Sequence, residues 1–140
     1  MYLDQTDLEK GLYPEILNVL TRSNPDNISN AISEAIAEVN SYLGVRYNMQ
    51  AEWNKSGSSR NVLVVKMVRD IALYNCYNIS NPVNMPESRV QKYKDTISFL
   101  KDVQAERAQL DGLTRLSDAS NISGSNYLTF GGNTKRNNSY

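Results

Sequence analysis

Asp70 is the residue whose type and position most suggest chemistry, because it is an acid within the most apolar stretch of the chain. A carboxylate in such surroundings can have a raised pKa and act as a general base. However, no second carboxylate lies near it in sequence, and the 140 residues contain no histidine, so histidine bases, His-containing triads and histidine metal sites are excluded. The pattern therefore favours a structural role, in which Asp70 pairs with Lys66 one helical turn earlier or with a backbone amide of another segment.

The other reactive groups match no catalytic or cofactor motif. The single cysteine, Cys76, has no partner in the chain for a disulfide or a thiolate zinc site, and it suits a small position in the core. Gly57 lacks the Gly-Lys-Ser/Thr context of a phosphate-binding loop, and no predicted helix follows Gly131 and Gly132. The sequence therefore predicts a protein that is not an enzyme and has no cofactor and no metal site.

The charge balance excludes further classes of function. Fifteen Lys and Arg residues are matched by fifteen Asp and Glu residues, so the formal net charge is zero. That balance argues against a protein built to bind nucleic acid.

No apolar run approaches the roughly 20 residues of a membrane span, and the N-terminus does not resemble a signal peptide. We expect a soluble protein from a reducing compartment, with no membrane partner.

Three long stretches have the spacing of apolar residues that predicts helices. The clearest covers 28–43, where apolar residues recur at i, i+3, i+4 and i+7, and Gly44 follows as a stop. Residues 61–78 are apolar on nearly all sides, which favours a helix buried over most of its surface. Residues 86–110 have an amphipathic pattern that we expect to end at Gly112.

The N-terminal residues predict shorter elements. Thr6 and Glu9 have the spacing of a capping box, and Pro14 suits the first position of the next helix. Residues 48–59 have the composition of a polar loop. We therefore expect an all-α fold, in which 1–116 form a small bundle of four to five helices.

The last 24 residues, 117–140, differ in composition from the rest of the chain. They contain five Asn, five Ser and three Gly. Such a segment buries too little apolar surface to offset the entropy lost on ordering. We therefore predict an extended C-terminal arm that neighbouring chains hold in place.

The candidate partner-binding residues are aromatic, apolar or basic, and most of them lie in this arm. They are Trp53, Tyr127, Leu128, Phe130, Lys135, Arg136 and Tyr140. The side chains of segment 127–130 have the alternation of a short strand. We expect this strand to add to the edge of a partner's sheet. The two basic residues would pair with acidic groups at the rim. Two roles stay open for Trp53: it either folds back as a lid over the bundle or is exposed and anchors an interface.

Three segments together resemble a known family. AEVNSYLGVRY at 37–47, RDIALY at 69–74 and YKDTISFLKD at 93–102 occur in an order and spacing similar to those of small head–tail adaptor (connector) proteins of tailed bacteriophages, in particular the family of Mu-like phages. The resemblance covers about residues 2–112.

The resemblance implies a structural virion protein. Such subunits form a ring, usually of twelve copies, beneath the portal protein; the ring extends the DNA channel and docks the next neck or tail component. It implies a location at the neck of the virion, after assembly in the cytoplasm of the bacterial host. Phage DNA would pass through the lumen without sequence-specific binding, and an uncharged channel wall suits that passage because it does not retain phosphates.

Three other functions stay open. One is a different neck part, namely a stopper or a tail-completion protein. Another is a small enzyme, which the missing histidine and the lack of paired carboxylates disfavour. The third is a helical module that binds nucleic acid. That module would need basic residues gathered on one exposed helix face, and the interleaving of lysines with acids along this chain argues against it.

Overall fold

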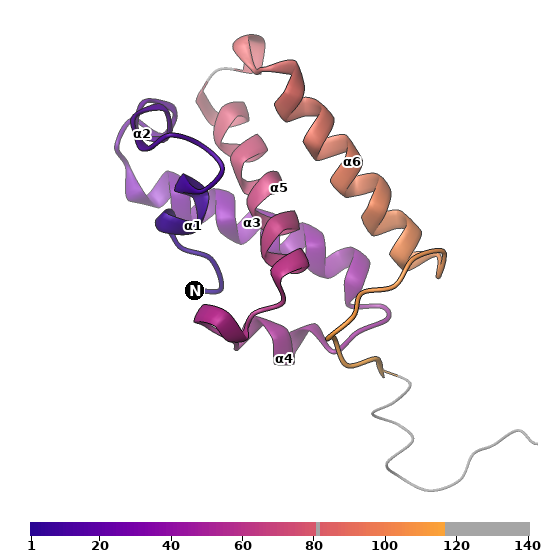
Figure 1. The fold of residues 1–140 in the computed structure, drawn as a ribbon. Coiled ribbons are helices and arrows are strands. Elements are labelled where there is room, and N and C mark those ends of the chain that lie inside the picture. The colour runs from indigo at the N-terminus through magenta and orange to yellow at the C-terminus, as the bar shows by residue number, and fades with distance from the viewer. Residues whose placement is uncertain (81, 117–140) are drawn as a thin grey trace, which may run out of the picture.

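The computed structural model describes residues 1–80 and 82–116, and these residues form an all-α bundle (Figure 1). The helices are α1 (Gln5–Glu9), α2 (Pro14–Thr21), α3 (Pro25–Leu43), α4 (Met49–Trp53), α5 (Val62–Ser80) and α6 (Glu87–Gln104), with 3₁₀ turns at Gly57–Ser59 and Pro82–Asn84. The predicted all-α fold class is confirmed, and the described residues contain six helices where four to five were predicted. The predicted arm at 117–140 lies outside the described residues.

Helix α5 is the centre of the bundle. It packs against α3, α6, α2 and α1, and α3 passes behind it in Figure 1. Its buried side chains point to several sides, as the continuous apolar pattern predicted; they are Val64, Met67, Val68, Asp70, Ile71, Ala72, Leu73, Cys76 and Tyr77. Burying each large aliphatic side chain stabilises the fold by about 1.5–3 kcal/mol.

The first helix has a capping box, but not the one that the sequence predicted. Asp4 is the N-cap: its carboxylate accepts a hydrogen bond from the Asp7 amide, and the Asp7 carboxylate accepts one from the Asp4 amide. Thr6 already lies inside the helix, and its hydroxyl donates to Asp4 Oδ1 at 2.6 Å. The predicted Thr6–Glu9 box is therefore wrong, because the helix begins two residues earlier. Pro14 does occupy the first turn of α2 as predicted.

Helix α6 ends at Gln104, earlier than the predicted position near Gly112. Glu106 adopts a left-handed backbone conformation with φ 62°, and this turn reverses the chain. The returning segment is held by backbone pairing: the Asn48 amide donates to the Thr114 carbonyl, and the Leu116 amide donates to the Arg46 carbonyl. The segment that precedes residue 117 is thus held against residues 46–48, which follow α3.

The predicted polar loop at 48–59 is also partly wrong. It contains α4, a helix of five residues, followed by the 3₁₀ turn. Asn48 is the N-cap of α4, and its side-chain oxygen accepts from the Ala51 amide. Met49 and Glu52 are buried, so α4 covers the lower end of the bundle.

Candidate functional site

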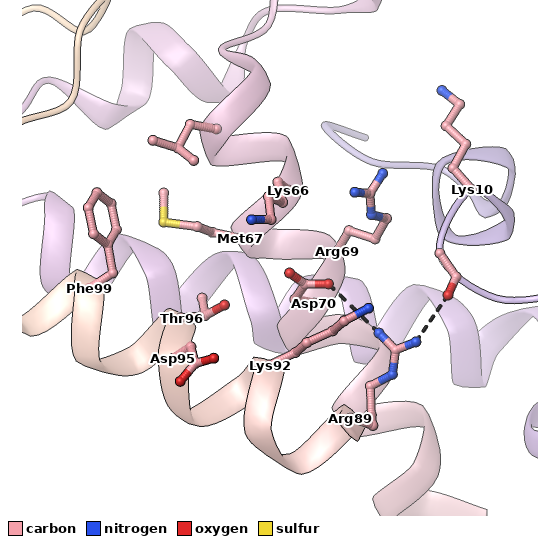
Figure 2. A pocket seen from close by; sticks show the side chains of 12 residues that line it. Lys10, Lys66, Met67, Arg69, Asp70, Arg89, Lys92, Asp95, Thr96 and Phe99 are labelled. Carbon is pink, nitrogen blue, oxygen red and sulfur yellow. Dashed lines mark hydrogen bonds and ion pairs between the residues drawn. The ribbon is translucent and has the colours of Figure 1, made fainter. Parts of the chain in front are cut away.

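A groove with a volume of about 550 Å³ lies between α5 and α6, with the turn after α1 at one end (Figure 2). We call it the α5–α6 groove, and it is lined by Lys10, Gly11, Leu63, Lys66, Met67, Arg69, Asp70, Arg89, Lys92, Asp95, Thr96 and Phe99. It contains Asp70, the acid that the sequence singled out.

Asp70 belongs to a buried ion pair. Its carboxylate Oδ1 lies 3.7 Å from Nη1 of Arg89, a residue of α6, and both side chains are about nine-tenths buried. Arg89 Nη2 donates a hydrogen bond of 3.0 Å to the Gly11 carbonyl (Figure 2). The predicted pairing with Lys66 is therefore wrong, since the partner comes from another helix. The arrangement ties α5, α6 and the turn after α1 together.

We expect Asp70→Asn to lower the free energy of unfolding by about 1–3 kcal/mol, because it leaves the buried Arg89 guanidinium without its counter-charge. Urea unfolding followed by circular dichroism measures this loss. Asp95→Asn is the matched control, since Asp95 lines the same groove but is exposed. Equal unfolding midpoints for the two variants would contradict the structural role of Asp70.

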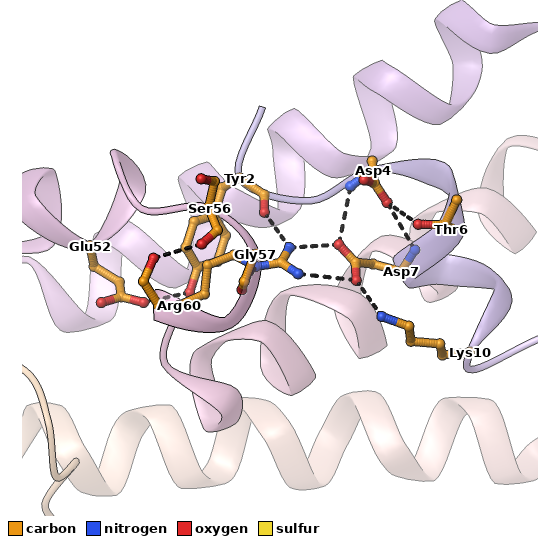
Figure 3. A network of polar contacts seen from close by, with 10 residues as sticks. Tyr2, Asp4, Thr6, Asp7, Lys10, Glu52, Ser56, Gly57 and Arg60 are labelled. Atoms are coloured by element: carbon orange, nitrogen blue, oxygen red, sulfur yellow. Dashed lines mark hydrogen bonds and ion pairs between the residues drawn. The ribbon is translucent and has the colours of Figure 1, made fainter.

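A second cluster of charges fastens the N-terminus to the segment before α5 (Figure 3). We call it the N-terminal ion network; it comprises Tyr2, Asp7, Lys10, Glu52, Lys55 and Arg60. Arg60 Nη1 lies 2.6 Å from Asp7 Oδ2 and also donates to the Tyr2 carbonyl at 2.7 Å. Lys10 Nζ contacts the other Asp7 oxygen at 2.9 Å. The hydrogen bond from Arg60, with help from Lys10 and against the effect of burial, holds the pKa of Asp7 well below its ordinary value.

Glu52 of α4 is the other acid of this network, and its side chain is only 1% exposed. It accepts hydrogen bonds from the Tyr2 hydroxyl at 2.7 Å, from Lys55 Nζ at 2.7 Å and from the Asn61 amide. Burial alone would raise the pKa of the Glu52 carboxyl, but these three donors lower it below its ordinary value. Burial and the Glu52 contact raise the pKa of the Tyr2 phenol. Glu52 therefore joins the N-terminus, α4 and the start of α5.

These two lowered pKa values predict a loss of stability in acid. The ordinary pKa values are 3.8 for Asp7 and 4.5 for Glu52, so the unfolded chain takes up protons at a higher pH than the folded chain. Stability from the network is fully present above about pH 5 and falls as the pH drops through and below these values. Urea midpoints between pH 7 and pH 3 measure the slope. Asp7→Asn should be less stable than the wild type at pH 7, and its urea midpoint should fall less steeply as the pH is lowered. An unchanged slope would contradict the role of Asp7 in the acid sensitivity.

Trp53 packs within the subunit. Its ring meets the Tyr2 ring edge-on, with 4.9 Å between centroids and an angle of 86° between the planes. Its indole Nε1 donates to Asn40 Oδ1 at 3.0 Å, and the side chain is half-buried against the core. These contacts favour the folded-back arrangement over the exposed anchor.

The remaining predicted partner-binding residues, namely Tyr127, Leu128, Phe130, Lys135, Arg136 and Tyr140, lie outside the described residues. Conversely, sequence reasoning missed Glu52 and Arg60. The available signal was Asn48, a good N-cap residue placed just before Met49.

The remaining reactive groups of the described residues form no further candidate site. Cys76 is fully buried, and burial raises the pKa of its thiol to about 11, which leaves it protonated and unreactive. Within residues 1–80 and 82–116, no three His, Cys, Asp or Glu side chains are grouped so as to hold a metal ion. In that same part of the chain, no helix is both long enough and apolar enough to cross a membrane.

Comparison with known proteins identifies the family. The family model described as Bacteriophage Mu, Gp36 matches residues 2–126, which include the whole bundle from Tyr2 onward and the ten residues that follow it. A search of the curated proteins finds no match. The match covers well over half of the chain, so this protein belongs to the bacteriophage Mu Gp36 family and is a virion-associated structural or assembly protein of a Mu-like phage.

Proposed function

We propose that this chain is a head–tail adaptor, which forms a ring beneath the portal protein at the neck of the virion. In this proposal the ring has twelve copies, extends the DNA channel and docks the next neck or tail protein. Assembly takes place in the cytoplasm of the bacterial host. The subunit catalyses no reaction, and DNA passes through the lumen without sequence-specific binding.

The observation that carries this proposal is the family match over residues 2–126, together with the three segments that resemble adaptor proteins. The physical properties of the subunit agree with it. Its polar networks are structural, since Asp70 is paired with Arg89 and Asp7 with Arg60. Its zero net charge suits a channel wall that does not retain phosphates.

The alternative within the same class is a stopper or a tail-completion protein. A helical nucleic-acid-binding module is the more distant alternative, and it would require tight binding of duplex DNA that weakens steeply with salt.

The test is the native mass of the purified full chain, alone and with the portal protein. We expect the mixture to contain a ring-sized species made of both proteins. Without the portal protein, a monomer in dilute solution is compatible with a ring that forms only on the portal. If the mixture contains only free subunits or a two-fold dimer, the adaptor proposal is wrong, because a ring requires head-to-tail contacts between two different faces of each subunit.

A further inference from the structure

The α5–α6 groove concentrates positive charge. Five of the thirteen Lys and Arg residues of 1–116 line it, but only two of the fourteen Asp and Glu residues do. Lys66 and Lys92 are exposed, and neither they nor Arg69 belongs to any ion pair of the described residues. The rest of the helical body therefore carries a net negative charge, which makes two parts of one subunit electrostatically complementary.

The groove also contains buried hydrogen-bond donors without acceptors. Arg89 Nη1 and Arg69 Nε are both buried, and neither has a hydrogen-bond acceptor among the described residues. The Arg89 side chain is only 9% exposed and lies beside the groove-lining Asp70 (Figure 2). Both guanidinium groups add positive charge to the lining of the groove, which an additional carboxylate bound there would balance.

The composition of the groove favours a protein carboxylate over a nucleic-acid phosphate. Leu63, Met67 and Phe99 give it an apolar part that suits the methylene groups and neighbouring side chains of a peptide. The ligand chemistry is therefore that of an acidic side chain on a folded protein surface.

The subunit itself carries a suitable acidic surface on the outer face of α3. Asp26 and Glu34 are exposed, and neither belongs to an ion pair of the described residues. They are eight residues apart, which places them about 12 Å apart along the helix. The inner side of α3 faces the other helices, since Ala31 accepts from Asn75 of α5 and Glu38 accepts from Tyr93 of α6. The acidic face therefore points away from the side on which the groove lies.

We propose that the α5–α6 groove binds the acidic outer face of α3 from a second copy of this chain, with Asp26 and Glu34 meeting the basic groove. This inference rests on the proposed ring, and it names the two faces that would meet in each contact. A basic face on one side and an acidic face on the other give a head-to-tail interface, which can close into a ring. Charge complementarity of this kind sets the register and suppresses wrong pairings.

Charge reversal in the full chain tests the pairing. Lys66→Glu/Lys92→Glu should weaken subunit association about tenfold or more in sedimentation with and without the portal protein. Lys94→Glu/Lys101→Glu is the matched control, because it makes the same charge change at exposed positions of α6 outside the groove. Adding Glu34→Lys to the groove variant should recover assembly, since the exchanged charges attract again. Lys66→Gln/Lys92→Gln provides a milder variant with the same expected direction if circular dichroism shows that the reversed chain is misfolded.

The outcomes separate this inference from the proposed function. Normal assembly of both groove variants would overturn the groove pairing and leave the ring intact. No assembly of the wild type, alone or with the portal protein, would overturn both. Normal assembly combined with a loss of duplex-DNA binding in fluorescence anisotropy would identify the groove as a phosphate site and would also overturn the pairing.

Discussion

Replacing Glu52 by alanine should lower the free energy of unfolding by about 1–3 kcal/mol, because it removes the acceptor of a buried hydroxyl and the counter-charge of a partly exposed lysine. The carboxylate is buried and accepts hydrogen bonds from the Tyr2 hydroxyl, Lys55 and the Asn61 amide. Alanine leaves the buried Tyr2 hydroxyl and the part-buried Asn61 amide without this acceptor, and it removes the counter-charge of Lys55. Urea unfolding at pH 7 measures the loss, provided that the variant and the wild type have the same m-value.

Two further variants assign this loss to its cause. Glu52→Gln keeps an acceptor for the Tyr2 hydroxyl but loses the charge, so its effect should be intermediate. Lys55→Ala removes only a partly exposed cation of the network, and we expect a loss below about 1 kcal/mol. If Glu52→Ala were no more destabilising than Lys55→Ala, the network would not hold the N-terminus as the hydrogen bonds indicate.

The long helices could be predicted from the sequence because their burial leaves a periodic pattern. Apolar residues recur through 28–43 with the spacing of a helix face, and α3 covers that stretch with its apolar face buried. The nearly continuous apolar stretch at 61–78 likewise predicted α5, which other helices surround. In both cases the packing decides which residue types are tolerated, so the residue types reveal the packing.

The short elements could not be predicted in the same way. Helix α4 has five residues, which is too short to show a period, and its position depends on Glu52 and on the contact between Trp53 and Tyr2. The partner of Asp70 had the same difficulty. The sequence indicated that this acid needs a partner, but Arg89 lies nineteen positions later and becomes a neighbour only through the packing of α5 on α6.

We expect residues 117–140, the predicted C-terminal arm, to be dispensable for the fold but required for assembly. A chain truncated after Leu116 should keep its helical circular dichroism and nearly the same melting temperature. The hydrogen bond from the Leu116 amide to the Arg46 carbonyl and the bridge between Tyr47 and Arg115 both lie within the retained residues. The truncated chain also keeps every core residue of the described part, from Tyr2 to Leu110, and Leu113, which packs against that core.

The same truncated chain should fail to enter the assembled neck, because we propose that residues 117–140 bind neighbouring chains. A short strand at 127–130 would add to the edge of a partner's sheet, and Lys135 and Arg136 would contribute a weaker, salt-sensitive attraction. Tyr127→Ser/Phe130→Ser in the full chain is the matched variant, since it keeps the length of the arm but removes its aromatic anchors. Native mass with the portal protein measures assembly. If the truncated chain unfolds, the arm belongs to the core; if it assembles like the full chain, the arm has no role in the neck.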